Sequence, residues 1–273
     1  MCTSFAVYAE KTLYGMNFDF PDVELKFRLS NTNHQQIFFL CVEGGGVFHE
    51  TTGMNADGLF AASQILVAPF EINPQPGDTL VSPRDIFFQA LSSASSVDEV
   101  LTILGHRRLG YRTDRKGHYL YADQHGAACV LEPSPDGNAI YRSMHTFTIM
   151  TNRPIRRDMD RAAGHMARLD LDRYQTAHKI IQERFGIFNV ADAFEVLQQT
   201  QLWKGRFKTL VSMVFDPHAK EVYLALGRDF DRIWRVCMQE HVAETYSGFG
   251  RYRQDEMGED GITVNQLLET NFA

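Results

Sequence analysis

The order of the hydrophobic patterns along the chain constrains its fold more than any other sequence feature. Strand-like runs fill the chain as far as Val67, a helical stretch follows, and strand-like and helical blocks then alternate. Strands are expected at Cys2–Tyr8, Thr12–Phe18, Gln36–Val42, Val47–Thr52, Leu59–Val67, His118–Ala122, Ala127–Leu131, Ala139–Tyr141, Thr146–Met150, Leu210–Phe215 and Glu221–Leu226. Blocks segregated in this way favour an α+β fold over a doubly wound βαβ sheet.

Helices are expected where a capping residue or a 3.6-residue period is visible. They are Arg84–Leu91, Ser96–Leu104, Arg156–Phe185 with a break near Asp170, and Ala191–Gln199. The three glycines at 44–46 lack the Lys-Ser/Thr of a phosphate loop and indicate a turn. Residues 1–273 are expected to form one domain, with a mobile loop where Gly and charged residues concentrate at 246–260.

Composition excludes several classes of function. The 27 basic and 34 acidic residues leave a net charge of −7, which disfavours binding to nucleic acids or to anionic membranes. No apolar run approaches the roughly 20 residues that span a bilayer, and the start of the chain lacks the pattern of a signal peptide. A cytoplasmic protein that binds neither nucleic acid nor membrane is therefore expected.

Common catalytic and metal-binding motifs are absent from the sequence. There is no GxSxG, HExxH or P-loop pattern, and the histidines do not have metal-ligand spacing. No metal and no cofactor are expected. The four cysteines form no CxxC, and Cys41, Cys129 and Cys237 are expected to be packed in the interior because a reduced Cys behaves as a small hydrophobic residue.

The dipeptide Met1-Cys2 points to a specific chemistry. Aminopeptidases remove an initiator Met when a small residue follows, so the mature chain is expected to begin with Cys2. One residue then carries a thiol and a free α-amine, whose ordinary pKa values of about 8.5 and about 8 allow the amine to serve as the base for the thiol. Met-Cys alone is also compatible with an incidental cysteine.

Further motifs occur in a fixed order behind this cysteine. They are Cys2-Thr3-Ser4, Gly15-Met16-Asn17-Phe18-Asp19-Phe20, Gly53-Met54-Asn55 with Gly58-Leu59, and Thr151-Asn152-Arg153-Pro154. Together they resemble the choloylglycine hydrolase family, which includes bile salt hydrolases, penicillin V acylases and related linear-amide C–N hydrolases. Acid-ceramidase-like proteins and acyltransferases share the layout. The resemblance runs from about Cys2 to Leu226 and implies a four-layer αββα N-terminal-nucleophile hydrolase sandwich.

The resemblance also implies roles for individual residues. Cys2 is the expected nucleophile, and Asp19, carried back beside it by a hairpin, is expected to orient its amine. Asn152 is the expected oxyanion donor, with a backbone N–H near Gln64 or Ile65 as the second donor. Two further expectations are that Arg173 lowers the thiol pKa and that Asn17 contributes to the substrate and oxyanion site.

One position departs from the family pattern. The family has Arg before the Asn of its Gly-Arg-Asn motif, and this chain has Met16. The resemblance implies a hydrolase of N-acylated small molecules, but two alternatives stay open: an N-acyltransferase, and a non-catalytic binding protein for which Met16 is the argument. The acyl group, the amine and homo-oligomerisation also stay open.

Overall fold

The computed structural model describes residues 2–33, 35–67, 76–110, 117–154 and 164–269. Two eight-stranded antiparallel sheets dominate it. Sheet A has the order β12-β1-β2-β13-β14-β15-β16-β17, and sheet B has the order β11-β10-β9-β6-β5-β4-β3-β18. A separate two-stranded sheet pairs β7 with β8 in parallel.

The strands of sheet A are β1 (Thr3–Tyr8), β2 (Thr12–Phe20), β12 (Phe147–Met150), β13 (Lys208–Asp216), β14 (Glu221–Leu226), β15 (Ile233–Cys237), β16 (Val242–Ser247) and β17 (Gln254–Glu256). Those of sheet B are β3 (Leu25–Thr32), β4 (Gln35–Gly44), β5 (Val47–Asn55), β6 (Phe60–Ile65), β9 (Gly117–Ala122), β10 (Ala127–Ser134), β11 (Gly137–Met144) and β18 (Ile262–Thr263). The remaining elements are β7 (Leu80–Val81), β8 (Arg108–Leu109), α1 (Pro83–Ser93), α2 (Val97–Leu104), α3 (Gly164–Arg184), α4 (Val190–Thr200) and α5 (Val264–Leu268).

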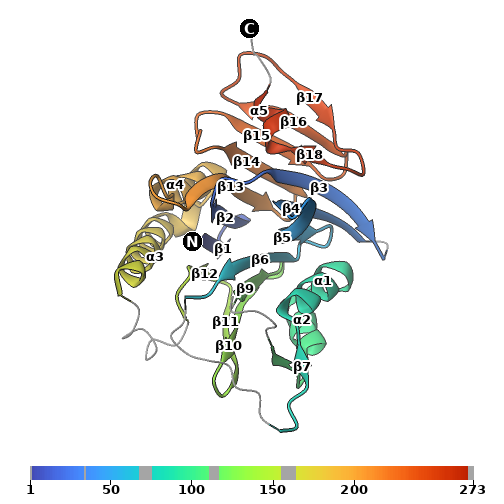
Figure 1. Ribbon diagram of the computed structural model, residues 1–273. Coiled ribbons are helices and arrows are strands. Elements are labelled where there is room, and N and C mark those ends of the chain that lie inside the picture. The colour runs from blue at the N-terminus through green and yellow to red at the C-terminus, as the bar shows by residue number, and fades with distance from the viewer. Residues whose placement is uncertain (1, 34, 68–75, 111–116, 155–163, 270–273) are drawn as a thin grey trace.

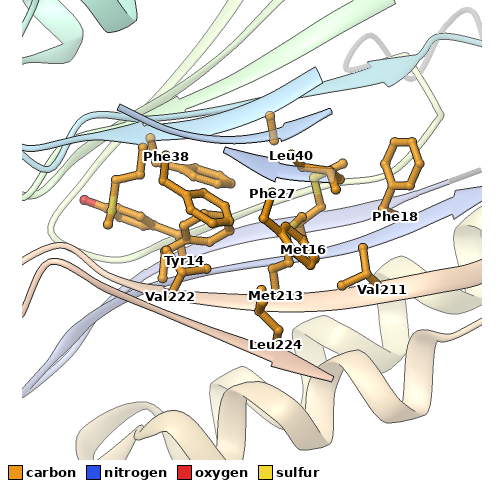
Figure 2. Close-up of a cluster of buried hydrophobic side chains, with 14 of the residues drawn as sticks. Tyr14, Met16, Phe18, Phe27, Phe38, Leu40, Val211, Met213, Val222 and Leu224 are labelled. Carbon is orange, nitrogen blue, oxygen red and sulfur yellow. The ribbon is translucent and has the colours of Figure 1, made fainter. Parts of the chain in front are cut away.

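Three apolar clusters separate four layers. The first lies between the two sheets and includes side chains of β2, β4, β13 and β14 (Figure 2). The second joins sheet B to α1 and α2, and the third joins sheet A to α3 and α4. Figure 1 accordingly shows the two helix pairs on opposite flanks of the strands. The expected α+β class and four-layer αββα arrangement are confirmed.

Local signals explain where the main helices begin. Ser82 caps α1 and is followed by proline, and Ser96 caps α2 by accepting a hydrogen bond from the backbone N–H of Glu99. Asn189 and Asp192 form a capping box at the start of α4. The turn between β4 and β5 has Gly45 and Gly46 at φ +67° and +82°, values that favour glycine.

One expectation about the elements is corrected, and several elements were not anticipated. The break near Asp170 is absent, because α3 runs through this residue and has no proline or internal glycine to interrupt it; the expected helical residues before 164 lie outside the described part. The stretch at 246–260 contains β17, paired with β16, and its expected mobility stays a prediction. The elements without a counterpart among the expected ones are β3, β7, β8, β15, β16, β17, β18 and α5.

No helix in the described part of the chain is long and apolar enough to cross a bilayer. The described residues also contain no group of three or more His, Cys, Asp or Glu side chains placed to hold a metal ion.

Candidate active site

The strands of sheet A bring Cys2 beside two other sequence-predicted residues. Cys2 directly precedes β1, which lies between β12 and β2. The register pairs Ser4 with Met150 and Thr3 with Asn17. Extending the β1–β12 register by two residues places Cys2 opposite Asn152. Extending the β1–β2 register by one residue places Cys2 beside the end of β2, which carries Asp19. Cys2, Asp19 and Asn152 are all buried.

Asn152 holds the backbone of Cys2. Its Oδ1 accepts a hydrogen bond from the Cys2 nitrogen at 2.6 Å, and its Nδ2 donates to the Ile65 carbonyl at 2.6 Å. The Asn152 carbonyl accepts from the Val67 N–H at 2.8 Å, which ties the segment after β12 to the segment after β6. An Asn amide has two N–H donors, and the bond to Ile65 uses one of them.

Arg173 on α3 joins the components of the site. Its guanidinium donates to Asp19 Oδ2 at 3.0 Å, to Asn152 Oδ1 at 3.2 Å and to Thr3 Oγ1 at 3.3 Å. Thr209 on β13 donates to the other carboxylate oxygen of Asp19 at 2.5 Å. Both side chains of the Asp19–Arg173 ion pair are buried, at 0% and 7% exposure, so water screens their attraction only weakly.

The thiol of Cys2 is shielded from solvent. Its Sγ is 3.9 Å from the Asp19 carbonyl oxygen, and the residue belongs to the cluster between the sheets. Burial raises the pKa of the thiol, the negative charge of Asp19 raises this pKa further, and the positive charge of Arg173 lowers it. A thiol in this setting needs a nearby base to become a nucleophile at neutral pH.

Gln64 on β6 contacts the start of β1 from the opposite sheet. With its amide oriented to satisfy both ends, its oxygen accepts from the Ser4 N–H at 3.1 Å and from the Ser4 hydroxyl at 2.6 Å. Its nitrogen donates to the Cys2 carbonyl at 3.3 Å. The side chain of Gln64 therefore adjoins the predicted nucleophile, and the carbonyl of Ile65 contacts Asn152.

Asn17 is placed in a different cluster from the other candidates. Its Nδ2 donates to the Leu197 carbonyl at 2.8 Å and to Thr200 Oγ1 at 3.1 Å, and its Oδ1 accepts from Ser212 at 2.6 Å. These contacts attach β2 to the end of α4. Because both ends of its amide are occupied by the protein itself, the structure gives Asn17 a fold-supporting environment instead of the expected place in the substrate site.

Met16 occupies the position where the family pattern has arginine. Its side chain is fully buried between the sheets, among Phe27 and Met213 (Figure 2). The Thr52 hydroxyl lies 2.9 Å from its sulfur. This position is therefore built as core, and Arg173 supplies the buried cation of the site.

Two features of the site escaped the sequence analysis. Thr209 is visible in the sequence only as a polar residue just before the apolar run that starts at Leu210. The second feature is a cavity of ≈ 540 Å³ beside Thr151, between the edges of the two sheets and α3. Its walls are formed by Val130, Tyr141, Ile149, Met150, Thr151, Arg153, Pro154, Leu171, Tyr174 and Gln175.

Comparison with known proteins relates this geometry to a family. The family model described as acyl-coenzyme A:6-aminopenicillanic acid acyl-transferase matches residues 8–231. Among solved structures, conjugated bile acid hydrolase from Clostridium perfringens, as its C2A mutant, has a TM-score of 0.68 at 13% identity, covering 95% of this chain and 98% of that one. Penicillin V acylase from Agrobacterium tumefaciens has a TM-score of 0.65 at 15% identity, covering 96% and 99%.

A third structure, the N-acylethanolamine-hydrolyzing acid amidase ortholog from Caenorhabditis elegans, has a TM-score of 0.52 at 13% identity, covering 79% of this chain and 93% of that one. At these identities the three structures establish a shared fold. The expected relationship to the bile acid hydrolase and penicillin V acylase group is thereby confirmed, and the fold is that of N-terminal-nucleophile hydrolases.

Proposed function

Because the chain belongs to the acyl-coenzyme A:6-aminopenicillanic acid acyl-transferase family, we propose that it hydrolyses non-peptide amide C–N bonds with Cys2 as nucleophile. One observation carries the proposal: the nitrogen of Cys2 is fixed at 2.6 Å from Asn152 Oδ1 while its thiol faces Asp19. Residues that are far apart in the sequence thus converge on the single residue that can carry both a nucleophile and its base.

The proposed reaction begins with removal of Met1, which frees the α-amine of Cys2. The amine takes the thiol proton, Sγ bonds to the acyl carbon, and a tetrahedral oxyanion forms. The second N–H of Asn152 Nδ2 donates to this oxyanion, a contact commonly worth about 3–4 kcal/mol. The C–N bond then breaks as the α-amine passes its proton to the departing nitrogen, leaving an acyl thioester on Cys2.

Water completes the cycle. The α-amine accepts a proton from water as the water oxygen bonds to the acyl carbon, and collapse of the second oxyanion breaks the C–S bond. The proton returns to sulfur. Arg173 and Asp19 stay paired throughout and hold Asn152 and the end of β2 in place around the reacting atoms.

The cavity beside Thr151 supports an N-acylated small molecule as the substrate. A volume of ≈ 540 Å³ lies within the range of small-molecule sites, and aliphatic and aromatic side chains form much of its wall. Thr151 and Arg153, which flank Asn152, both line it. The proposal places the acyl group, attached at Cys2, against the apolar wall of this cavity.

Acyl transfer is a second candidate, because the matching family model is described as an acyl-transferase. In that reaction an amine replaces water in attacking the same thioester, so the residues keep their roles. Product analysis in the presence of hydroxylamine separates the two. A hydroxamate formed at the expense of the free acid shows that the thioester accepts amines, whereas free acid alone favours hydrolysis.

The direct test is the intact mass of the purified protein before and after iodoacetamide, with Cys2→Ala as the control. Loss of Met1 together with one Cys2-dependent adduct is the expected result and justifies a screen of N-acyl amides. Retention of Met1 with no adduct at Cys2 would remove the mechanism and favour a non-catalytic binding protein on this fold.

A further inference from the structure

A row of three buried polar side chains crosses sheet B at the end that faces the start of β1. Gln64 on β6 and His118 on β9 are register partners, and His118 Nδ1 lies 3.3 Å from Glu132 Oε2 on β10. Their exposures are 2%, 0% and 1%. The mechanism above gives no role to His118 or Glu132.

The row points toward the other sheet. Side chains alternate along a strand, and Ala62, Leu120 and Val130, two residues from Gln64, His118 and Glu132 respectively, belong to the cluster between the sheets. Gln64 then completes the crossing by bonding to Ser4 and to the Cys2 carbonyl. The polar row therefore extends from Glu132 to the backbone of the predicted nucleophile.

Stability alone does not account for this row. His118 Nε2 is buried and has no hydrogen-bond partner among the described residues, and such a group typically costs about 1–3 kcal/mol. Well-packed apolar residues of similar volume often serve a core as well as a buried polar pair or better. A costly polar pair on the wall opposite Cys2 is more consistent with a role in the site.

We propose that His118 and Glu132 are positioning residues that act on Cys2 through Gln64, an inference that rests on the proposed function. Directly paired residues on one face of a sheet have Cβ atoms about 4.5–5.5 Å apart. The imidazole, anchored by Glu132, limits the rotation of the neighbouring Gln64 side chain and keeps its amide on Ser4 and Cys2. Misplacing a reacting group by about 1 Å can cost on the order of 100-fold in rate.

A double-mutant cycle tests whether His118 acts through Gln64. His118→Phe keeps a ring but loses the bond to Glu132, and Gln64→Ala removes the contact to β1. Each is expected to lower kcat about 10- to 100-fold with KM changed less than about threefold. The double variant is expected to be no slower than the slower single variant, because both changes remove the same constraint. Glu132→Gln, which can still bond to His118 Nδ1, is expected to retain most of the activity.

Multiplicative losses in kcat would overturn the proposal, because they would indicate that His118 acts independently of Gln64. Unchanged kcat in His118→Phe would also overturn it. Tyr121→Phe, on the opposite face of β9, controls for general damage to the strand. If His118→Phe does not fold, His118→Asn, which preserves a polar atom near the Nδ1 position, takes its place in the cycle.

The alkylation rate of Cys2 by iodoacetamide gives a readout that does not depend on turnover. Slower or faster alkylation in both Gln64→Ala and His118→Phe, but not in Tyr121→Phe, is expected if the thiol is displaced. A wild-type thiol that does not react at all would defeat the proposed function. A reactive wild-type thiol with equal rates in all variants would defeat the positioning role alone.

Discussion

At the scale of single residues, the site depends on one buried ion pair. Removing either partner leaves the other charge buried, which typically costs about 3–5 kcal/mol. We therefore expect Asp19→Asn and Arg173→Met each to lower the free energy of unfolding by about this amount, and the double variant to lose less than the sum. Urea denaturation followed by circular dichroism measures the difference.

The ion pair between Lys208 and Asp22 provides the control. Its side chains are 37% and 77% exposed, so Asp22→Asn is expected to change stability by less than about 1 kcal/mol. If Asp19→Asn lowers the free energy of unfolding no more than Asp22→Asn does, the buried ion pair does not contribute to stability as its burial implies.

The ionisation of Cys2 gives a second prediction at this scale. Burial raises the pKa of the thiol, so its alkylation rate should keep increasing with pH beyond the range of an ordinary cysteine. Asp19→Asn removes a charge that raises this pKa and should shift the pH–rate profile to lower pH, whereas Arg173→Met should shift it to higher pH. Peptide mass spectrometry of Cys2 at a series of pH values measures both shifts.

The raised pKa of the Cys2 thiol also makes the stability of the protein depend on pH in a defined direction. Because the folded pKa of the thiol lies above the unfolded value, its contribution to stability is present below the unfolded pKa and is lost as pH rises toward the folded pKa. For the alkylation of Cys2, pH–rate profiles of Asp19→Asn and Arg173→Met that shift in the same direction would contradict the opposing charges assigned to Asp19 and Arg173.

The ordered motifs predicted which residues lie close together better than they predicted the contacts of each residue. Cys2, Asp19, Asn152 and Arg173 are brought together, as expected from motif order. Asn17 is two residues from Asp19, but whether its amide would meet a substrate or a helix end depends on α4, which packs against sheet A from far along the chain. The ordered motifs carry no information about that docking.

At the scale of elements, the pairing of β1 with β2 needs a glycine. Gly15 is the register partner of Phe5, and a Cβ at position 15 would overlap the Phe5 ring. We expect Gly15→Ala to destabilise the protein by about 1–3 kcal/mol through overpacking. Phe5→Leu in the same chain should recover part of the loss, because it clears the space above residue 15.

Thermal unfolding of the two single variants and the double variant checks this expectation. Gly186, where an added Cβ meets nothing within 4 Å, provides the matched control as Gly186→Ala. A Gly15→Ala variant as stable as Gly186→Ala would show that the two strands can separate enough to admit a methyl group.

Elements with strong local signals were the ones that could be predicted. Capped helices and apolar strands fall close to their expected positions, and their apolar side chains form the three clusters between the four layers. β3 was missed although Leu25, Phe27 and Leu29 alternate with polar residues, so its pattern was available. β17 and β18 have three residues and two residues respectively and depend on pairing with β16 and β3, which no local pattern encodes.

At the scale of the whole molecule, the cavity exists because three layers meet beside Asn152. Val130 and Tyr141 come from sheet B, Ile149 from the edge of sheet A, and Leu171 and Tyr174 from α3. No single motif contains these residues. Under the proposed function, substrate choice is set by how the layers dock, whereas the chemistry is set by Cys2 and its immediate partners.

This separation predicts that the size of the acyl group can be changed without changing the chemistry. Leu171→Trp adds bulk to the cavity wall from α3, a change that should exclude long acyl chains first. Each methylene that loses its apolar contact weakens binding by about 1 kcal/mol, so the loss should increase with chain length. Over a series from N-acetyl to N-decanoyl amides of one chromogenic amine, kcat/KM should decrease progressively more for longer chains, and N-acetyl hydrolysis should stay within about twofold of wild type.

Ile187→Trp, at a side chain that is 71% exposed and beyond the end of α3, controls for adding an indole to the surface. The expected result is a decrease in kcat/KM that grows with chain length in Leu171→Trp and no decrease in the control, because Leu171 lines the cavity and Ile187 does not. An equal loss for all chain lengths would mean that the bulk on α3 disturbs Arg173 and the nucleophile. No loss at any length would mean that the acyl group leaves Cys2 in another direction, and the cavity would then be assigned to the amine.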